Sequence, residues 1–74
     1  MAWKHCPTCP GDDMKWFREL EENEHGPAAT AVLALFPEEA PFRPSAYYRC
    51  THGSCRRVQR KDRWKTGATL PEGL

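Results

Sequence analysis

The sequence predicts a small, metal-stabilised α+β domain in which two cysteine knuckles and two or three short β-strands carry a helical hairpin as an insert. Three observations predict this class. The chain has 74 residues and a mean hydropathy of −0.79, so its apolar core is too small to stabilise a fold without a further crosslink. Its four cysteines form two close pairs that are forty residues apart. The interval between the pairs carries apolar residues at helical spacing.

The two cysteine pairs have the spacing of metal ligands. Cys6 and Cys9 are separated by two residues, and Cys50 and Cys55 by four residues that include a glycine. Each pair can turn both sulfur atoms toward one ion, and four thiolates complete a tetrahedral zinc site. Because no position remains for water, we expect one structural Zn²⁺ ion, with iron in a rubredoxin-type site as the alternative.

Alternatives to a four-cysteine site within one chain stay open at this point. Disulfides need an oxidising compartment, but the first residues lack the apolar stretch of a secretory signal. We therefore expect free thiols and a cytoplasmic location. His5 or His52 could replace a cysteine as ligand, although a histidine at a knuckle tip is more often solvated. The two knuckles could also bridge two chains.

The interval between the knuckles predicts two helices. After a short strand at residues 2–5, apolar side chains recur every three residues and predict a helix over residues 12–25. Gly26-Pro27 is typical of a helix end followed by a helix start. Residues 28–36 are almost entirely apolar and predict a second helix. The resulting hairpin, an insert at about residues 12–36, would be covered either by the core or by a partner.

The second half of the chain predicts a connector and a ribbon. Three of the seven prolines fall within residues 37–46 and predict an extended connector. Residues 47–49 and 56–60 are expected to be the strands that enter and leave the second knuckle. A third strand is expected at residues 63–66, with a helix over residues 56–65 as the alternative.

The length of the chain limits both its domain count and its functions. It allows one domain, which we expect at residues 1–67, followed by a loose tail at residues 68–74. No apolar run reaches the roughly 18 residues of a membrane span, so we expect no membrane partner. Because so short a chain cannot enclose a deep pocket and shows no catalytic motif, we expect neither an enzyme nor a small-molecule substrate.

The net charge of +1 hides a separation of charge along the chain. Residues 1–45 carry four basic and eight acidic side chains, whereas residues 46–74 carry seven basic and two acidic ones. Basic residues interleaved with a tryptophan can bind phosphates and bases, or an acidic protein surface. They can also form a solvated face, with the tryptophan in the core. The candidate binding residues are Arg56, Arg57, Arg60, Lys61, Arg63, Trp64 and Lys65.

The two knuckles, each with a short strand, resemble the zinc-ribbon group. The segment Tyr47–Cys50 followed by Cys55 is locally similar to the second half of the Ogr/Delta-type phage transcription activators, and the likeness covers residues 5–10 and 47–58. The interval between the knuckles is longer here than in that family. The resemblance implies a role at promoters through contact with RNA polymerase, and it implies four zinc ligands, Cys6, Cys9, Cys50 and Cys55.

These observations predict a small zinc-binding module of phage or bacterial type that regulates transcription. Its basic C-terminal ribbon would bind RNA polymerase, nucleic acid or both. The alternative is a protein-interaction adaptor or inhibitor that docks through the apolar helix 28–36 or the acidic helix 12–25, without nucleic acid. Self-association through the apolar helix belongs to this alternative.

Overall fold

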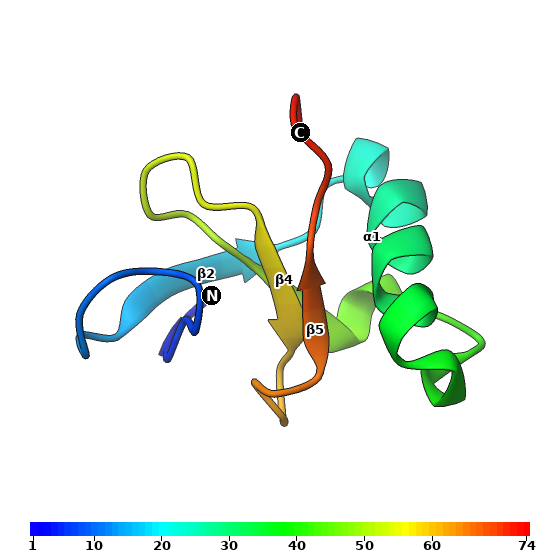
Figure 1. Ribbon diagram of the computed structural model, residues 1–74, viewed down its shortest axis with the longest axis horizontal. Helices are drawn as coiled ribbons and strands as arrows, with labels where there is room; N and C mark the ends of the chain where they lie inside the picture. The colour runs from blue at the N-terminus through cyan, green and yellow to red at the C-terminus, as the bar shows by residue number, and fades with distance from the viewer.

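Five strands form one antiparallel sheet in which neighbours in the chain are also neighbours in space (Figure 1). The computed structural model describes all residues 1–74, and it confirms the predicted small α+β class. None of its helices is both long and apolar enough for a membrane span. The elements in chain order are β1 (Ala2–Lys4), β2 (Lys15–Glu19), α1 (Glu22–Leu35), the 3-10 helices η1 (Pro37–Glu39) and η2 (Pro44–Ala46), β3 (Tyr47–Cys50), β4 (Arg57–Arg60) and β5 (Gly67–Thr69).

The register of the strands assigns their side chains to two faces, because successive side chains of a strand point in opposite directions. Val58 lies opposite both Arg49 and Ala68 on the face that α1 covers, which we call the helix face. Phe17 lies opposite Cys50 on the other face, which carries the cysteine knuckles and which we call the cysteine face. Each face has its own small core.

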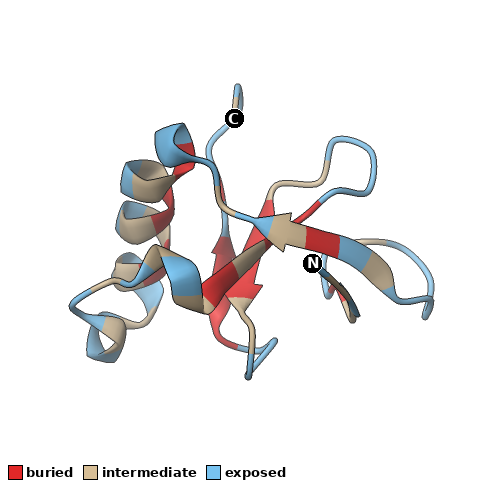
Figure 2. Ribbon diagram, turned by 180° about the vertical axis from the view of Figure 1, so that it is seen from behind, coloured by how far each residue is buried: buried red, intermediate tan, exposed pale blue.

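The core of the helix face lies between α1 and strands β3 to β5. Figure 2 shows the buried stripe of α1 turned toward buried segments of the sheet. The helix begins with a capping box, in which the Glu21 and Glu24 side chains each accept a hydrogen bond from the other residue's backbone N–H. Six buried residues form this core: Ala28, Val32, Tyr47, Val58, Ala68 and Leu70.

The predicted helix over residues 12–25 is wrong, because Lys15–Glu19 form strand β2. Phe17 is fully buried between Cys6 and Cys50, and Trp16 lies opposite Trp3 of β1. The helical spacing of the apolar residues is real, but pairing with β1 and β3 on both sides outweighs it. Aromatic side chains also suit a half-buried strand better than they suit a helix.

The predicted helical hairpin is also wrong, because α1 runs from Glu22 through Gly26 and Pro27 without a break. Pro27 lies in the second turn, where its missing N–H leaves only the carbonyl of Asn23 without an intrahelical partner. Gly26 has no Cβ that could clash with the ring of the following proline. The absence of this clash reduces the cost of the proline within the helix.

The proline-rich connector contains two 3-10 turns instead of one extended segment. A proline stands at the first position of each turn, where its missing N–H would have no intrahelical partner. The carboxylate of Glu39 accepts hydrogen bonds from the Tyr47 hydroxyl and from the Arg60 guanidinium, both at 2.7 Å. The connector is thereby held against β3 and β4.

The C-terminal residues belong to the fold, so the predicted boundary at residue 67 and the loose tail are wrong. The third strand of the ribbon is Gly67–Thr69, and residues 63–66 form the turn before it. Leu70 is buried in the core of the helix face, and its N–H donates to the Arg56 carbonyl at 2.9 Å. The alternative of a helix over residues 56–65 is excluded by β4.

Gly67 allows β5 to lie close to β4, and we expect Gly67→Ala to lower the free energy of unfolding by about 1–3 kcal/mol. A Cβ atom at this position would lie 2.2 Å from the Val58 carbonyl oxygen and 2.8 Å from the Gln59 Cα atom. Urea unfolding followed by circular dichroism would measure the loss. Ser54→Ala is the control, because it changes an exposed side chain away from this contact. Equal stability of the two variants would contradict this packing argument.

Candidate metal centre

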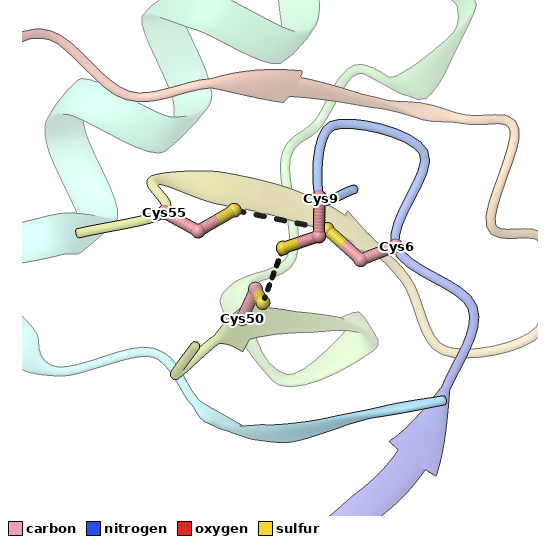
Figure 3. Close-up of side chains that lie close together, drawn as sticks. All are labelled: Cys6, Cys9, Cys50 and Cys55. Carbon is pink, nitrogen blue, oxygen red and sulfur yellow. Dashed lines mark hydrogen bonds between the residues drawn. The ribbon is translucent and has the colours of Figure 1, made fainter. Parts of the chain in front are cut away.

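Two loops bring the four cysteines together on the cysteine face. The first loop follows β1, and its turn is closed by the Cys9 N–H, which donates to the Cys6 carbonyl at 3.3 Å. The second loop joins β3 to β4. Cys50 is the last residue of β3, and the Cys55 N–H donates to the His52 carbonyl at 3.0 Å. Figure 3 shows the four side chains pointing toward one another. The predicted convergence of the cysteines is confirmed.

The separations of the sulfur atoms fit a tetrahedral metal site. The Cys6 and Cys55 sulfurs are 3.7 Å apart, as are those of Cys9 and Cys50, and all four lie within 4.8 Å of one another. Four Zn–S bonds of about 2.3 Å in tetrahedral geometry place sulfurs about 3.8 Å apart. A disulfide needs about 2.05 Å, and all four cysteines are free.

Hydrogen bonds to the sheet hold both cysteine loops in place. The backbone N–H and the hydroxyl of Thr51 both donate to the Trp16 carbonyl, at 3.0 and 2.7 Å. The side-chain amide of Gln59, buried in β4, donates to the His5 carbonyl at 2.8 Å. The two Thr51 bonds tie the second loop to β2. The Gln59 bond ties the chain that enters the first loop to β4. The geometry of the cluster therefore depends on the sheet.

The pKa values of three of the four thiols depart from the ordinary value. Burial raises the pKa of Cys6, but hydrogen bonds from Thr8 and from the neighbouring thiols outweigh burial and lower this pKa to about 7. Burial and the neighbouring thiols raise the pKa of Cys9 well above its usual value. Burial, together with Cys55, raises the pKa of Cys50 to about 11. Four thiolates at this spacing repel one another, and a bound metal ion removes that repulsion.

Neither histidine belongs to the cluster. The group of side chains that could hold a metal ion consists of the four cysteines alone. The His5 ring packs edge-on against Trp64, with the ring centroids 4.5 Å apart. His52 lies at the tip of the second loop, and its backbone N–H points to the Cys50 sulfur at 3.5 Å. The structure therefore gives both histidines roles outside the ligand set.

Arg57 brings a buried positive charge close to the cysteines. Its guanidinium donates to the Gln59 side-chain oxygen at 3.1 Å and to the Trp64 carbonyl at 2.6 Å, and it forms no ion pair with a carboxylate. Burial lowers the pKa of Arg57, and the charges of Cys6 and Cys55 partly offset this effect. Arg57 can therefore compensate part of the negative charge that four thiolates bring to the site.

The predicted basic cluster does not form one free surface. Arg57 is buried, and the Arg56 Nε atom donates to the Leu70 carbonyl at 2.9 Å. Arg60 pairs with Glu39 at 2.7 Å and with Asp62 at 2.8 Å. Lys61 pairs with Glu19 and lies 4.7 Å from the centre of the Tyr48 ring. Arg63, Trp64 and Lys65 remain exposed in the turn before β5.

Sequence reasoning missed several residues that build this region. The Thr8 hydroxyl lies 3.3 Å from the Cys6 sulfur and 3.2 Å from the Cys55 sulfur, so it links the two knuckles. A hydroxyl inside the Cys-Pro-Thr-Cys segment is a signal that could have identified it. Gln59 follows the core residue Val58 in its strand, and nothing local marks it, whereas Arg57 was predicted as a binding residue and not as a buried neighbour of the cysteines. Their positions follow from the strand register alone.

The fold and the site together define a small α+β protein with a four-cysteine cluster that could hold a metal ion. Comparisons of the chain with protein-family models, with curated proteins and with solved structures gave no match. The assignment of a function therefore depends on the chemistry of the site and of the surface around it.

Proposed function

We propose that this protein is a zinc-stabilised binding module whose four cysteines hold one structural Zn²⁺ ion. The 3.7 Å separations of the sulfur atoms carry this proposal, because they are close to the edge length of a tetrahedral zinc–thiolate site. Zinc is the ion that closed four-thiolate sites commonly hold. Four protein ligands leave no position for water, so the ion stabilises the fold and does not activate a substrate. The proposal includes a reducing compartment such as the cytoplasm, where thiols remain free.

Metal analysis combined with native mass spectrometry tests the zinc site. We expect one zinc ion per chain, bound within a single chain, and a colourless protein. Cys9→Ser should lose the ion, whereas His52→Ala, His5→Ala and the loop control Ser54→Ala should retain it. Iron in a coloured protein, a zinc ion shared by two chains, or loss of zinc in either histidine variant would contradict the proposed site.

The binding role that we propose is contact with nucleic acid in transcription. Arg63 and Lys65 form no ion pair and flank the exposed Trp64. Cations bind phosphates, and an exposed tryptophan can stack on a base. RNA polymerase as a second partner rests on the local resemblance of residues 5–10 and 47–58 to the phage activators. The adaptor alternative has less support, because α1 buries Ala28 and Val32 against the sheet.

A salt titration of binding tests the nucleic-acid role. The zinc-loaded protein should bind a labelled oligonucleotide at low salt and release it as salt increases, because bound counterions compete for the phosphates. The double variant Arg63→Gln/Lys65→Gln should bind more weakly than the Arg43→Gln control, which changes an unpaired cation in the connector. No binding at low salt by a protein that carries zinc would contradict the nucleic-acid role and leave the zinc site intact.

A further inference from the structure

Strand β1 forms an open edge of the sheet. The strand order runs from β1 to β5, so β1 pairs with β2 on one side alone, and no other backbone hydrogen bond reaches residues 2–4. The helix α1 packs against β5 and the two 3-10 helices, and Figure 1 shows it away from β2 and the N-terminus. The outer edge of β1 therefore presents backbone N–H and C=O groups that can pair with a further strand.

The register gives the hairpin of β1 and β2 two different faces, because successive side chains of a strand point in opposite directions. Trp3 lies opposite Trp16, and both are on the helix face but outside its core. Lys4 lies opposite Lys15, two residues before the buried Phe17, on the cysteine face. One face of the hairpin thus carries tryptophans, and the other carries lysines.

The tryptophan face of this hairpin is exposed to solvent. The rings of Trp3 and Trp16 pack edge-on with centroids 5.2 Å apart, yet they are 64% and 39% exposed. Met14, directly before β2, is exposed as well. Tryptophan is highly buried on average, and exposed apolar side chains that lie together mark an interaction site. A strand added beside β1 would place an apolar side chain next to Trp3, where β-branched residues pack well.

The lysine face of the hairpin has no acidic partner. Neither Lys4 nor Lys15 forms an ion pair, and like charges directly opposite each other destabilise a sheet. A carboxylate placed beside Lys4 by an added strand would offset this repulsion. A second copy of the chain would increase it, because antiparallel pairing of two β1 strands brings four lysines to one face. The charges therefore favour an acidic partner over self-association.

We propose that β1 binds an extended segment of a partner protein in which acidic and apolar side chains alternate. The segment extends the sheet by one strand, with an apolar residue beside Trp3 and an acidic residue beside Lys4. In strand addition of this kind, main-chain hydrogen bonds provide affinity and alternate side chains provide specificity. This edge gives the module a protein partner in addition to the proposed nucleic-acid role, and it does not depend on that role.

Fluorescence anisotropy on the folded full chain tests this proposal with a labelled peptide in which glutamate and valine alternate. We expect this peptide to bind more tightly than two controls, one with the same residues in two blocks and one with lysine in place of glutamate. Only alternation places carboxylates and methyl groups on opposite faces of one strand. Hydrogen–deuterium exchange of the amides in β1 should slow when the alternating peptide is bound, because pairing protects backbone N–H groups.

Substitutions in the hairpin identify the side chains that the peptide contacts. Lys4→Glu should weaken binding by roughly 2- to 30-fold, because a repulsive pair replaces an attractive one. Lys15→Glu, one strand further from the edge, should weaken it less. Trp3→Ala should weaken binding by roughly 2- to 5-fold. Lys4→Arg keeps the charge, and Leu35→Ala removes an exposed apolar side chain at the end of α1, so both should bind as the unchanged protein does. Circular dichroism and zinc content show whether each variant has folded.

Three results would overturn this assignment of β1. Equal affinity for the alternating and block peptides would show that strand pairing does not determine binding. Unchanged affinity in both Lys4→Glu and Trp3→Ala would place the contact elsewhere. A folded protein that binds none of the three peptides would exclude the acidic partner, and dimerisation that Trp3→Ala abolishes would then assign the edge to a second copy of the chain.

Discussion

Removal of the metal ion with a strong chelator, or Cys9→Ser or Cys50→Ser, is expected to unfold the sheet. The hydrophobic core of the cysteine face has only three buried residues, Cys6, Phe17 and Cys50, and two of them are proposed metal ligands. Structural zinc contributes about 10–16 kcal/mol of binding free energy at pH 7, whereas a typical domain is stable by about 5–15 kcal/mol. The binding free energy of the metal ion is therefore comparable to the whole free energy of unfolding of the domain.

The unfolding that follows metal removal should also reach the helix face, because β3 and β4 carry residues of both cores. Val58 of β4 packs under α1, while Cys50 ends the neighbouring strand and belongs to the other core. Thermal melting followed by far-ultraviolet circular dichroism, with and without chelator, measures the effect. Ser54→Ala, an exposed position in the same loop, should melt as the unchanged protein does. An unchanged melting curve in protein shown to be free of metal would exclude a structural ion.

Glu24→Ala is expected to lower the free energy of unfolding by about 3–5 kcal/mol, because it leaves buried charge without a partner. The Glu24 side chain is 2% exposed and accepts two hydrogen bonds from Arg18, at 2.9 and 3.0 Å, and one from Arg49. It also accepts the Glu21 N–H at 2.7 Å, which caps α1. One carboxylate thus joins the helix N-terminus to β2 and β3. Urea unfolding at neutral pH measures the loss.

The matched control for this prediction is Glu22→Gln, which changes an exposed carboxylate of the same helical turn. Glu22→Gln should lower the free energy of unfolding by less than about 1 kcal/mol, because this substitution removes only an interaction with the helix dipole. Arg49 also donates to the Leu74 carbonyl at 2.7 Å, so Glu24→Ala should loosen the C-terminal residues as well. Equal losses in the two variants would show that the buried ion pairs contribute nothing specific.

The Glu24 carboxylate makes the free energy of unfolding depend on pH. Burial raises the pKa of Glu24, but hydrogen bonds from Arg18, from the Glu21 N–H and from Arg49 outweigh burial and lower the pKa to about 2. The ordinary pKa of a glutamate carboxyl is 4.5. The contribution of Glu24 to the free energy of unfolding is therefore complete above about pH 4.5 and is lost as the pH falls toward 2. Acid also protonates the cysteines, but this effect is common to the unchanged protein and Glu24→Gln. The difference between their stabilities should therefore shrink over this range.

Part of the fold could be predicted because its signals are local. The spacing of the cysteines indicated which side chains converge, and Tyr47–Cys50 and Arg57–Arg60 are strands close to the predicted bounds. Residues 15–19 could not be assigned locally, because their aromatic side chains also fit a helical stripe. Phe17 is in a strand because β1 and β3 pair with it on both sides and Cys6 and Cys50 enclose its ring.

The basic cluster shows that local sequence signals are equally limited in predicting which charged residues are free on the surface. The sequence identified seven neighbouring residues, but their availability depends on partners far along the chain. Glu19 neutralises Lys61, and Glu39 neutralises Arg60. Trp3 and Trp16, which lie in the separate strands β1 and β2, are both exposed and pack against each other. Charge density along the sequence therefore included free cations, Arg63 and Lys65, but did not distinguish them from the paired ones.

The sequence by itself determined the four-cysteine cluster, the α+β class and the separation of acidic and basic halves, because ligand spacing and composition are properties of short segments. The tertiary structure alone decided that residues 15–19 form a strand and that α1 continues through Pro27. It also decided that Leu70 lies in the core and that Glu24 is buried between two arginines. Each of these outcomes depends on contacts between distant segments, whose free energy exceeds the local preferences of the residues involved.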